Sequence, residues 1–295
     1  DLSSVKLAFS GSAPLPMELF KRFEEAAGIN IVEGYGLTEA TCLVSGNPVD
    51  GVKKVGSIGV PFPYTDVKIF KVGPEGAVEC DTDEIGEICI SSPGINVGET
   101  YTEADKNKDL YHGSYLRTGD LGRIDSDHYI WITGRAKDLI IRGGHNIDPA
   151  EIEEALLGHE AVAFAGAIGQ PDLHAGEVPC AFVELVEGAN VTPEELMEHC
   201  KVHVHERAAQ PKHVEILAEL PKTAVGKVFK PDLRKSAITR IYNAALEEAG
   251  VTARVSKVID DKKRGLVAQL DRKGADEADV VKVLGGFTRP WEWAA

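Results

Sequence analysis

The segment from Tyr115 to Asn146 constrains the fold more strongly than any other part of this sequence. Two short runs rich in apolar and β-branched residues, 122–125 and 128–133, flank a turn-prone group at 125–127. This pattern predicts a tight antiparallel hairpin, because strand formers on both sides of a polar turn can pair with each other. The strongly apolar residues 139–141 then carry the chain away from the hairpin.

Polar groups of three kinds border this hairpin. Asp120 follows a glycine, so we expect its carboxylate to project from a bend and accept two hydrogen bonds, as a ribose diol requires. Arg135 ends the second run with a planar cation that suits phosphate or ribose oxygens. Gly143 and Gly144 can adopt positive φ and let a thin ligand lie close to the backbone. Each residue alone is usually a turn or a solvated side chain, but the combination predicts a nucleotide-shaped site.

A helix is expected directly after this cluster. Asp148 is its predicted N-cap, Pro149 lies in its first turn, and Glu151 completes a capping box. Gly158 predicts its end. The polar cluster therefore lies immediately before the start of a new folding unit.

A strand, a helix and a second strand open the chain, at residues 5–9, 16–28 and 29–32. This order predicts a parallel pair of strands with a right-handed crossover. Ligands bind at the carboxyl ends of such strands, which here lead into the loop 10–14 and the segment 34–39.

The segment 34–39 offers candidate ligand groups. Tyr35 stands between two glycines, where its ring can stack on a base, although a packed core aromatic is the commoner use. Thr38 and Glu39 follow what we expect to be a glycine-rich bend, and they offer oxygen ligands for a magnesium ion shared with phosphates. A Thr-Glu pair alone more often marks a helix N-terminus.

Several motifs resemble the adenylate-forming superfamily, which comprises acyl-CoA synthetases, luciferases and the adenylation domains of peptide synthetases. YLRTGD, GRAKDLIIRGG and NIDPAEIE match its core motifs in order and spacing, and GYGLTEAT is similar to its most diagnostic motif. The resemblance covers roughly residues 5–235 and implies that Tyr35 lies against adenine, that Glu39 binds magnesium and that Thr38 shares its catalytic motif. SGSAP resembles the loop that lines the adenine pocket, with Ser10-Gly11 where Gly-Gly is commoner. The cofactor-binding residues implied are Ser12, Ala13, Pro14, Tyr35, Gly36, Asp120, Arg135, Gly143 and Gly144.

A proline and glycine loop at residues 221–227 resembles the second diagnostic motif of the superfamily. A lysine on such a loop is normally a solvated charge, but the resemblance implies that Lys227 is catalytic. Its point charge can bridge the substrate carboxylate and the α-phosphate. The neighbouring lysines 222, 230 and 235 do not occupy the motif position.

The resemblance implies an α/β and α+β fold in three parts. Residues 1–137 are expected to form the C-terminal part of a large AMP-binding domain, a parallel α/β unit with a small β-barrel subdomain near 56–89. Residues 138–235 are expected to form a small mobile α+β domain that rotates about the hinge residue Asp138. Residues 236–295 read as an αββα extension used for capping or self-association.

Composition limits the classes of partner. The chain has 47 acidic and 32 basic residues, a net charge of −15, so nucleic acid is an unfavourable partner. No apolar run has the length of a membrane helix, and five cysteines without a C-x-x-C pair suit reduced thiols, so we expect a soluble cytoplasmic protein. His199, Cys200, His203 and His205 invite a zinc hypothesis, which ordinary helix polarity outweighs.

The implied activity is a two-step acid–CoA ligase that uses ATP, Mg²⁺ and CoA and acts on a carboxylic acid, expected to be a fatty acid. The family's phosphate loop is missing from this sequence, and the chain begins without methionine, so it resembles the later part of a longer enzyme with a missing N-terminal half or a self-association partner. The alternatives are an adenylating enzyme with a carrier protein or oxygen as acceptor, or a catalytically incomplete fragment that binds AMP or CoA. The resemblance also implies a lysine acetyltransferase acting on Lys227.

Overall fold

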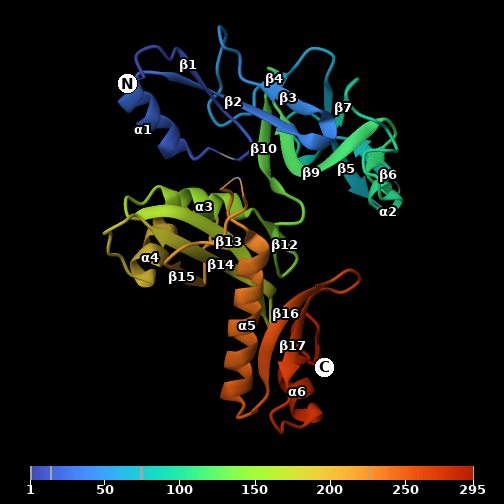
Figure 1. Ribbon diagram of the computed structural model, residues 1–295, viewed down its shortest axis with the longest axis vertical. Helices are drawn as coiled ribbons and strands as arrows, with labels where there is room; N and C mark the ends of the chain where they lie inside the picture. The colour runs from blue at the N-terminus through green and yellow to red at the C-terminus, as the bar shows by residue number, and fades with distance from the viewer. Residues whose placement is uncertain (1, 14, 74–75, 225, 295) are drawn as a thin grey trace. The chain divides into compact units, whose positions relative to one another are not determined.

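The computed structural model describes residues 2–13, 15–73, 76–224 and 226–294, and it divides into two compact units, 1–137 and 138–295 (Figure 1). Mixed sheets and helices make up both units, so the expected α/β and α+β fold class is confirmed. No helix among the described residues combines the length and the apolar character needed to cross a membrane.

The first unit begins with the predicted strand, helix and strand. Strands β1 and β2 pair in parallel, with Leu7 opposite Asn30, and α1 ends at Gly28 with a φ of 64°. Strands β3 and β4 extend this pair into a four-stranded sheet, and the other strands of the unit form a second, six-stranded sheet. The elements of this unit are β1 (Leu7–Ser10), α1 (Met17–Ala27), β2 (Asn30–Leu37), η1 (Thr38–Ala40), β3 (Cys42–Gly46), β4 (Val60–Pro61), β5 (Asp66–Gly73), β6 (Gly76–Glu79), β7 (Gly86–Ser91), α2 (Ala104–Asn107), β8 (Tyr111–His112), β9 (Tyr115–Ile124) and β10 (Ile130–Arg135).

The expected glycine-rich bend at Gly34-Tyr35-Gly36 is wrong, because β2 continues through it to Leu37. Neither glycine has a positive φ. Glycine is required at both positions because neighbouring atoms approach the backbone closely. A Cβ atom on Gly34 would lie 2.4 Å from the ring of Phe9, and one on Gly36 would lie 1.5 Å from the carbonyl oxygen of Cys42. The strand therefore extends past the neighbouring backbone and delivers Tyr35 from a paired position.

The hairpin predicted from residues 122–133 is confirmed as β9 and β10, which pair antiparallel. They belong to a six-stranded sheet of order β10-β9-β7-β5-β6, with β8 on β9, in the region where a small barrel is expected. Its inner face buries Ile88, Ile90, Leu116 and Ile130 completely.

The second unit contains a mixed sheet with helices on both faces. Strand β14 pairs antiparallel with β13 and parallel with β15, and a short hairpin of β11 and β12 extends the sheet. Helices α3 and α4 cover one face, and the first half of α5 covers the other. The elements are β11 (Ile140–Arg142), β12 (His145–Ile147), α3 (Pro149–Leu157), β13 (Val162–Asp172), β14 (Gly176–Leu185), α4 (Pro193–His203), β15 (His213–Leu217), α5 (Lys230–Glu248), β16 (Arg254–Asp261), β17 (Gly265–Asp271), α6 (Glu277–Leu284) and β18 (Trp291–Trp293).

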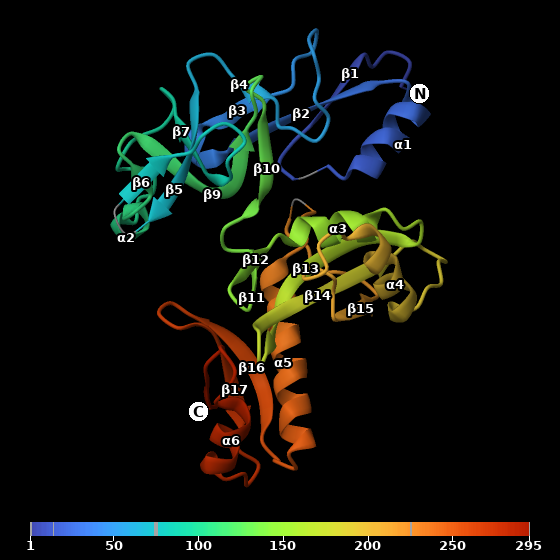
Figure 2. The ribbon, with the colours of Figure 1, turned by 180° about the vertical axis from the view of Figure 1, so that it is seen from behind.

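Helix α5 is continuous across the expected boundary between residues 235 and 236. The views from both sides show it running from the central sheet of this unit to β16 and β17 (Figures 1 and 2). The expected αββα extension is incomplete, because β18 adds a third strand that pairs parallel with β17. The short Trp-Glu-Trp strand carries no sequence signal of its own beyond alternation.

The capping box predicted for α3 is wrong. Asp148 caps the helix by accepting from the backbone N–H of Ala150 at 2.9 Å, as predicted, but Glu151 accepts from the backbone N–H of His205 at 2.8 Å instead. A long-range contact therefore replaces the local one. A capping box is present in α4, between Thr192 and Glu195.

Burial raises the pKa of the Asp148 carboxyl to about 6, although the Ala150 N–H and Lys230 oppose the shift. The folded protein therefore binds a proton at Asp148 more tightly than the unfolded chain, so its free energy of unfolding falls as pH rises from about 4 through about 6. We expect Asp148→Asn, which keeps a good N-cap, to remove on the order of 1–3 kcal/mol of that fall in urea titrations between pH 4 and 7.

The matched control is Asp276→Asn. Asp276 caps α6 in the same way, by accepting from the N–H of Ala278 at 3.0 Å, but its side chain is exposed. This variant should keep the pH dependence of the unmodified chain. Equal pH dependence in Asp148→Asn and the unmodified chain contradicts the assignment.

Candidate functional site

Three side chains meet around one buried carboxylate in the first unit. Tyr35 of β2 donates its hydroxyl to Oδ2 of Asp120 in β9 at 2.5 Å. Arg135, the last residue of β10, places Nε 2.7 Å from Oδ1 of the same carboxylate. Burial raises the pKa of Tyr35, and the charge of Asp120 and the hydrogen bond to it raise it further. The Tyr35 phenol therefore stays protonated and donates to the carboxylate of Asp120.

Asp120 lies inside strand β9 and not at the predicted bend, and 6% of its side chain is exposed. It accepts two hydrogen bonds, as expected, but the donors are Tyr35 and Arg135 of this chain. An ionised carboxylate offers about four acceptor positions, so it retains capacity for the hydroxyls of a ribose. Arg135 is 64% exposed, which leaves most of its guanidinium open to a phosphate or ribose oxygen.

Glu39 lies in the short helix η1, which directly follows β2, the strand that carries Tyr35. Thr38 beside it is exposed. One carboxylate oxygen of Glu39, Oε1, accepts from the hydroxyl of Tyr101. This hydrogen bond, followed by burial, raises the pKa of Tyr101 to about 12. The second oxygen has no hydrogen-bond partner in the described part of the chain. A half-buried carboxylate with one oxygen available fits a magnesium ligand.

Sequence reasoning missed Tyr101 as a partner of Glu39. The two residues are 62 positions apart, and no local pattern around Tyr101 indicates the contact. Thr100, next to Tyr101, contacts the hydroxyl of Tyr111. Both contacts arise from the way residues 96–111 fold over this end of the unit.

The small-residue loop after β1 lies beside β2. A Cβ atom on Gly11 would lie 3.1 Å from the carbonyl oxygen of Gly34, next to Tyr35. Ser12 has a φ of 69°, and Ser12 and Ala13 are exposed. Pro14 is outside the described residues. The structure thus brings the start of this loop next to the strand that carries Tyr35, and the roles of its side chains stay predictions.

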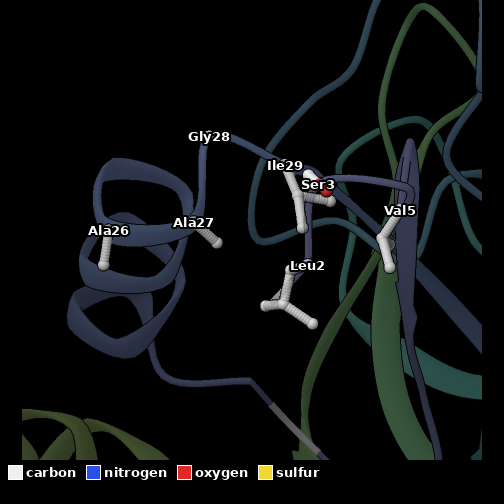
Figure 3. Close-up of a pocket in the computed structure, with 7 residues that line it drawn as sticks. All are labelled: Leu2, Ser3, Val5, Ala26, Ala27, Gly28 and Ile29. Carbon is white, nitrogen blue, oxygen red and sulfur yellow. The ribbon is translucent and has the colours of Figure 1, made fainter.

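A shallow pocket near the start of the chain lies apart from these residues. It is lined by Leu2, Ser3, Val5 and the end of α1 with Gly28 and Ile29 (Figure 3). None of its lining residues has a titratable side chain. We assign no chemistry to it.

In the second unit, Gly143 and Gly144 form the turn between β11 and β12. Their φ angles are 59° and 84°, so the predicted positive φ is confirmed. A Cβ atom on either glycine would meet no other atom within 4 Å, which leaves the tip of this hairpin open. The backbone N–H of Gly143 donates to the carbonyl of Ala175 at 2.7 Å. The hairpin is therefore fixed at its base and exposed at its tip.

Lys227 differs from the three other lysines of its region. Lys222 pairs with Glu184 at 2.8 Å, Lys230 with Glu153 at 2.8 Å, and Lys235 with Asp232 at 2.9 Å. Lys227 is exposed, and its ammonium has no ion pair with any residue that the structure describes. The backbone of Lys227 is tied to that of Thr223, whose N–H donates to the carbonyl of Lys227 at 2.7 Å. Among the described residues, Lys227 is thus an unpaired cation at an anchored backbone position.

Asp138 is the first residue of the second unit. Its carboxylate accepts from Arg234 of α5 at 2.7 Å, and both side chains are mostly buried. The ion pair fixes the residue to α5 on one side only. This position suits a pivot, and the hinge role stays a prediction.

Neither candidate metal cluster supports a metal site. Cys200 is completely buried in the core, and Nε2 of His199 lies 2.9 Å from the carbonyl oxygen of Ala155. Among the described residues, ligand atoms of Glu87, Cys89 and His112 lie within 4.8 Å of one another. There, Arg117 occupies the carboxylate of Glu87 at 2.9 Å, and burial raises the pKa of the Cys89 thiol to about 12. A neutral thiol beside a guanidinium is a poor place for a cation.

Comparisons with known proteins follow the same division of the chain. Residues 1–102 match the sequence profile described as AMP-binding enzyme, and residues 151–227 match that of the AMP-binding enzyme C-terminal domain. The marinolic acid–CoA ligase of a Pseudoalteromonas species is 42% identical over 265 residues, which are 88% of this chain and 40% of that protein. The long-chain-fatty-acid–CoA ligase of Bacillus subtilis is 40% identical over 78% of this chain and 40% of its own length. The sulfoacetate–CoA ligase of Cupriavidus necator is 39% identical over 80% of this chain and 45% of its own length.

Two solved structures agree in fold. An anthranilate CoA ligase in complex with anthranoyl-AMP superposes with a TM-score of 0.74 at 31% identity, over 82% of this chain and 46% of that one. The O-succinylbenzoate coenzyme A synthetase of Bacillus subtilis, in complex with ATP and magnesium, gives a TM-score of 0.66 at 31% identity, over 77% and 46%. This chain therefore spans less than half the length of the relatives and structures that it matches.

Proposed function

The chain belongs to the family of AMP-binding enzymes, and from this membership we propose that it serves in an AMP-forming acid–CoA ligase. The observation that carries the proposal is its similarity to three named CoA ligases, each at or close to 40% identity. Their substrates differ widely, so similarity alone does not choose the acid. We propose a fatty acid, because long-chain-fatty-acid–CoA ligases recur among these relatives.

The proposed first step joins the acid to AMP. The carboxylate of the acid attacks the α-phosphate of ATP, and pyrophosphate leaves. Asp120 accepts from the ribose hydroxyls, and Tyr35 lies against the adenine ring. Lys227 offsets the negative charge that develops at the α-phosphate, which an unpaired ammonium can do without breaking an ion pair. Glu39 would hold a magnesium ion, which would neutralise charge on the phosphates.

The proposed second step transfers the acyl group to CoA. The thiol of CoA attacks the acyl-adenylate, a thioester forms, and AMP leaves. We propose that the second unit turns about Asp138 between the steps and that the open Gly143-Gly144 turn accepts the thin pantetheine arm. A cytoplasmic location and acetylation of Lys227 also stay predictions.

The proposal is tested by acid-dependent ATP–pyrophosphate exchange on the folded chain, with acetate, octanoate, palmitate and benzoate as probes. Exchange with one of these acids supports the ligase and identifies the substrate class. A folded chain that binds AMP but catalyses no exchange with any of them contradicts a complete adenylation site in these residues. It would then be an AMP-binding part of the enzyme only.

Lys227→Ala should lower the rate of exchange by ~10²–10³, the usual loss when a group that stabilises developing charge is removed. Thioester formation from preformed acyl-adenylate should be retained. The control is Lys235→Ala, which removes a lysine that pairs locally with Asp232 and should change neither rate. Equal loss of both steps in Lys227→Ala argues against this division of roles.

Asp138→Pro should retain exchange and slow thioester formation by about tenfold or more, because proline fixes φ at the pivot. The control is Asp138→Ala, which removes the ion pair with Arg234 but leaves φ free. Both rates are measured separately, in single turnover. A hinge at Asp138 is excluded if proline and alanine have the same effect on the second step.

A further inference from the structure

Residues 236–295 lie beyond the segment that matches the C-terminal family profile, 151–227. They are nevertheless firmly attached to the rest of the second unit. The first half of α5 contributes Leu233 and Ala237 to the core of the central sheet, and the second half contributes Tyr242 and Leu246 to the core of the extension. One rigid helix therefore belongs to two cores, and the position of the extension is set relative to the sheet.

The segment between α6 and β18 lies against the turn that joins β13 to β14. A Cβ atom on Gly286 would lie 3.0 Å from the side chain of Leu173, and one on Gly176 would lie 3.5 Å from the methyl group of Thr288. The backbone of Arg289 is anchored, because its carbonyl accepts from the hydroxyl of the buried Tyr242 at 2.5 Å. Its guanidinium donates to Oε1 of Glu177 at 2.8 Å.

Glu177 connects this arginine to the glycine hairpin. Its other oxygen, Oε2, accepts from the backbone N–H of Ile141 at 3.2 Å, on the strand that leads into Gly143. The Glu177 side chain is 15% exposed and lies over Gly169, where a Cβ atom would be 2.3 Å from Oε2. Since that side of the carboxylate is enclosed, Arg289 is the cation that compensates its charge among the described residues.

We propose that the extension acts as a buttress for the Gly143-Gly144 hairpin, with Arg289 as a positioning residue that works through Glu177. The guanidinium of Arg289 positions the carboxylate of Glu177, and this carboxylate accepts from the N–H of Ile141. The strand that contains Ile141 is thereby fixed, and with it the turn that begins two residues later. Without Arg289, Glu177 turns toward solvent to hydrate its charge, and the base of the hairpin loosens.

This role deepens the proposed function, on which its catalytic part rests. A hairpin that guides a thin acceptor must be rigid, because displacements near 1 Å at a positioning group can cost about 10²-fold in rate. The extension therefore affects the acceptance of CoA and leaves adenylation unchanged. The match to the marinolic acid–CoA ligase covers 88% of the chain and so includes part of the extension.

The test is Arg289→Met in the 295-residue chain, with two separate measurements. Hydrogen–deuterium exchange of the peptide that contains Ile141 should become at least several-fold faster, whether or not the chain is active. With the acid that supports exchange, the KM for CoA should rise by about tenfold to 100-fold while ATP–pyrophosphate exchange is unchanged. Arg289→Lys, which keeps the cation, should increase both the deuterium exchange rate at Ile141 and the KM for CoA by less than Arg289→Met does.

The matched control is Arg264→Met. Arg264 also belongs to the extension and pairs with Glu292 at 2.8 Å, but its partners lie within the extension. It should leave both measurements unchanged. Unchanged deuterium exchange at Ile141 in a folded Arg289→Met protein overturns the buttress itself. Faster exchange with an unchanged KM for CoA overturns its role in acceptor binding, and a chain without adenylation activity contradicts a complete adenylation site in these residues, while the deuterium measurement still decides the buttress.

Discussion

The buried carboxylate of Asp120 is the constraint on which the first unit depends. An unpaired charge at this depth is strongly unfavourable, so the folded state must bring a donor and a cation to it. Tyr35 comes from one sheet and Arg135 from the end of another strand, so the pairing fixes the ends of β2, β9 and β10 relative to one another. The same electrostatic requirement that organises the fold brings together Tyr35, Asp120 and Arg135, the residues that we propose as ribose and phosphate contacts.

In the second unit, ion pairing of the neighbouring cations leaves one lysine without an acidic partner among the described residues. Acidic partners neutralise Lys222, Lys230 and Arg234, all at or near the start of α5. Lys227 is left unpaired in the same region of the described chain, although its backbone is ordered by Thr223. A cation without a protein partner is solvated by water and available to an incoming anion at little cost. The distribution of acidic residues therefore distinguishes Lys227, the proposed catalytic lysine, from its paired neighbours.

Local patterns predicted much of this architecture. Alternation and turn residues predicted the β9–β10 hairpin, and the helix signals around Pro16 and Asp148 predicted two helices that are present. The failures share a cause, since each involves a partner far away in sequence. Gly34 allows the ring of Phe9 to approach the backbone closely, Glu151 accepts from the distant His205, and Tyr101 contacts Glu39. Local propensity contains no information on such contacts, because tertiary packing decides them.

The extension illustrates how a segment outside a family profile can still act on a site within it. A flexible linker would leave 236–295 free to move, and its contacts with the hairpin would then be weakened by the entropy of ordering it. Helix α5 avoids this loss, because its Leu233 and Leu246 are buried in two different cores and its backbone is continuous between them. Residues 236–295 therefore become ordered when the core of the second unit forms. The ion pair of Arg289 and Glu177 then acts between groups already held near each other, which is the condition under which a partly exposed pair contributes to rigidity.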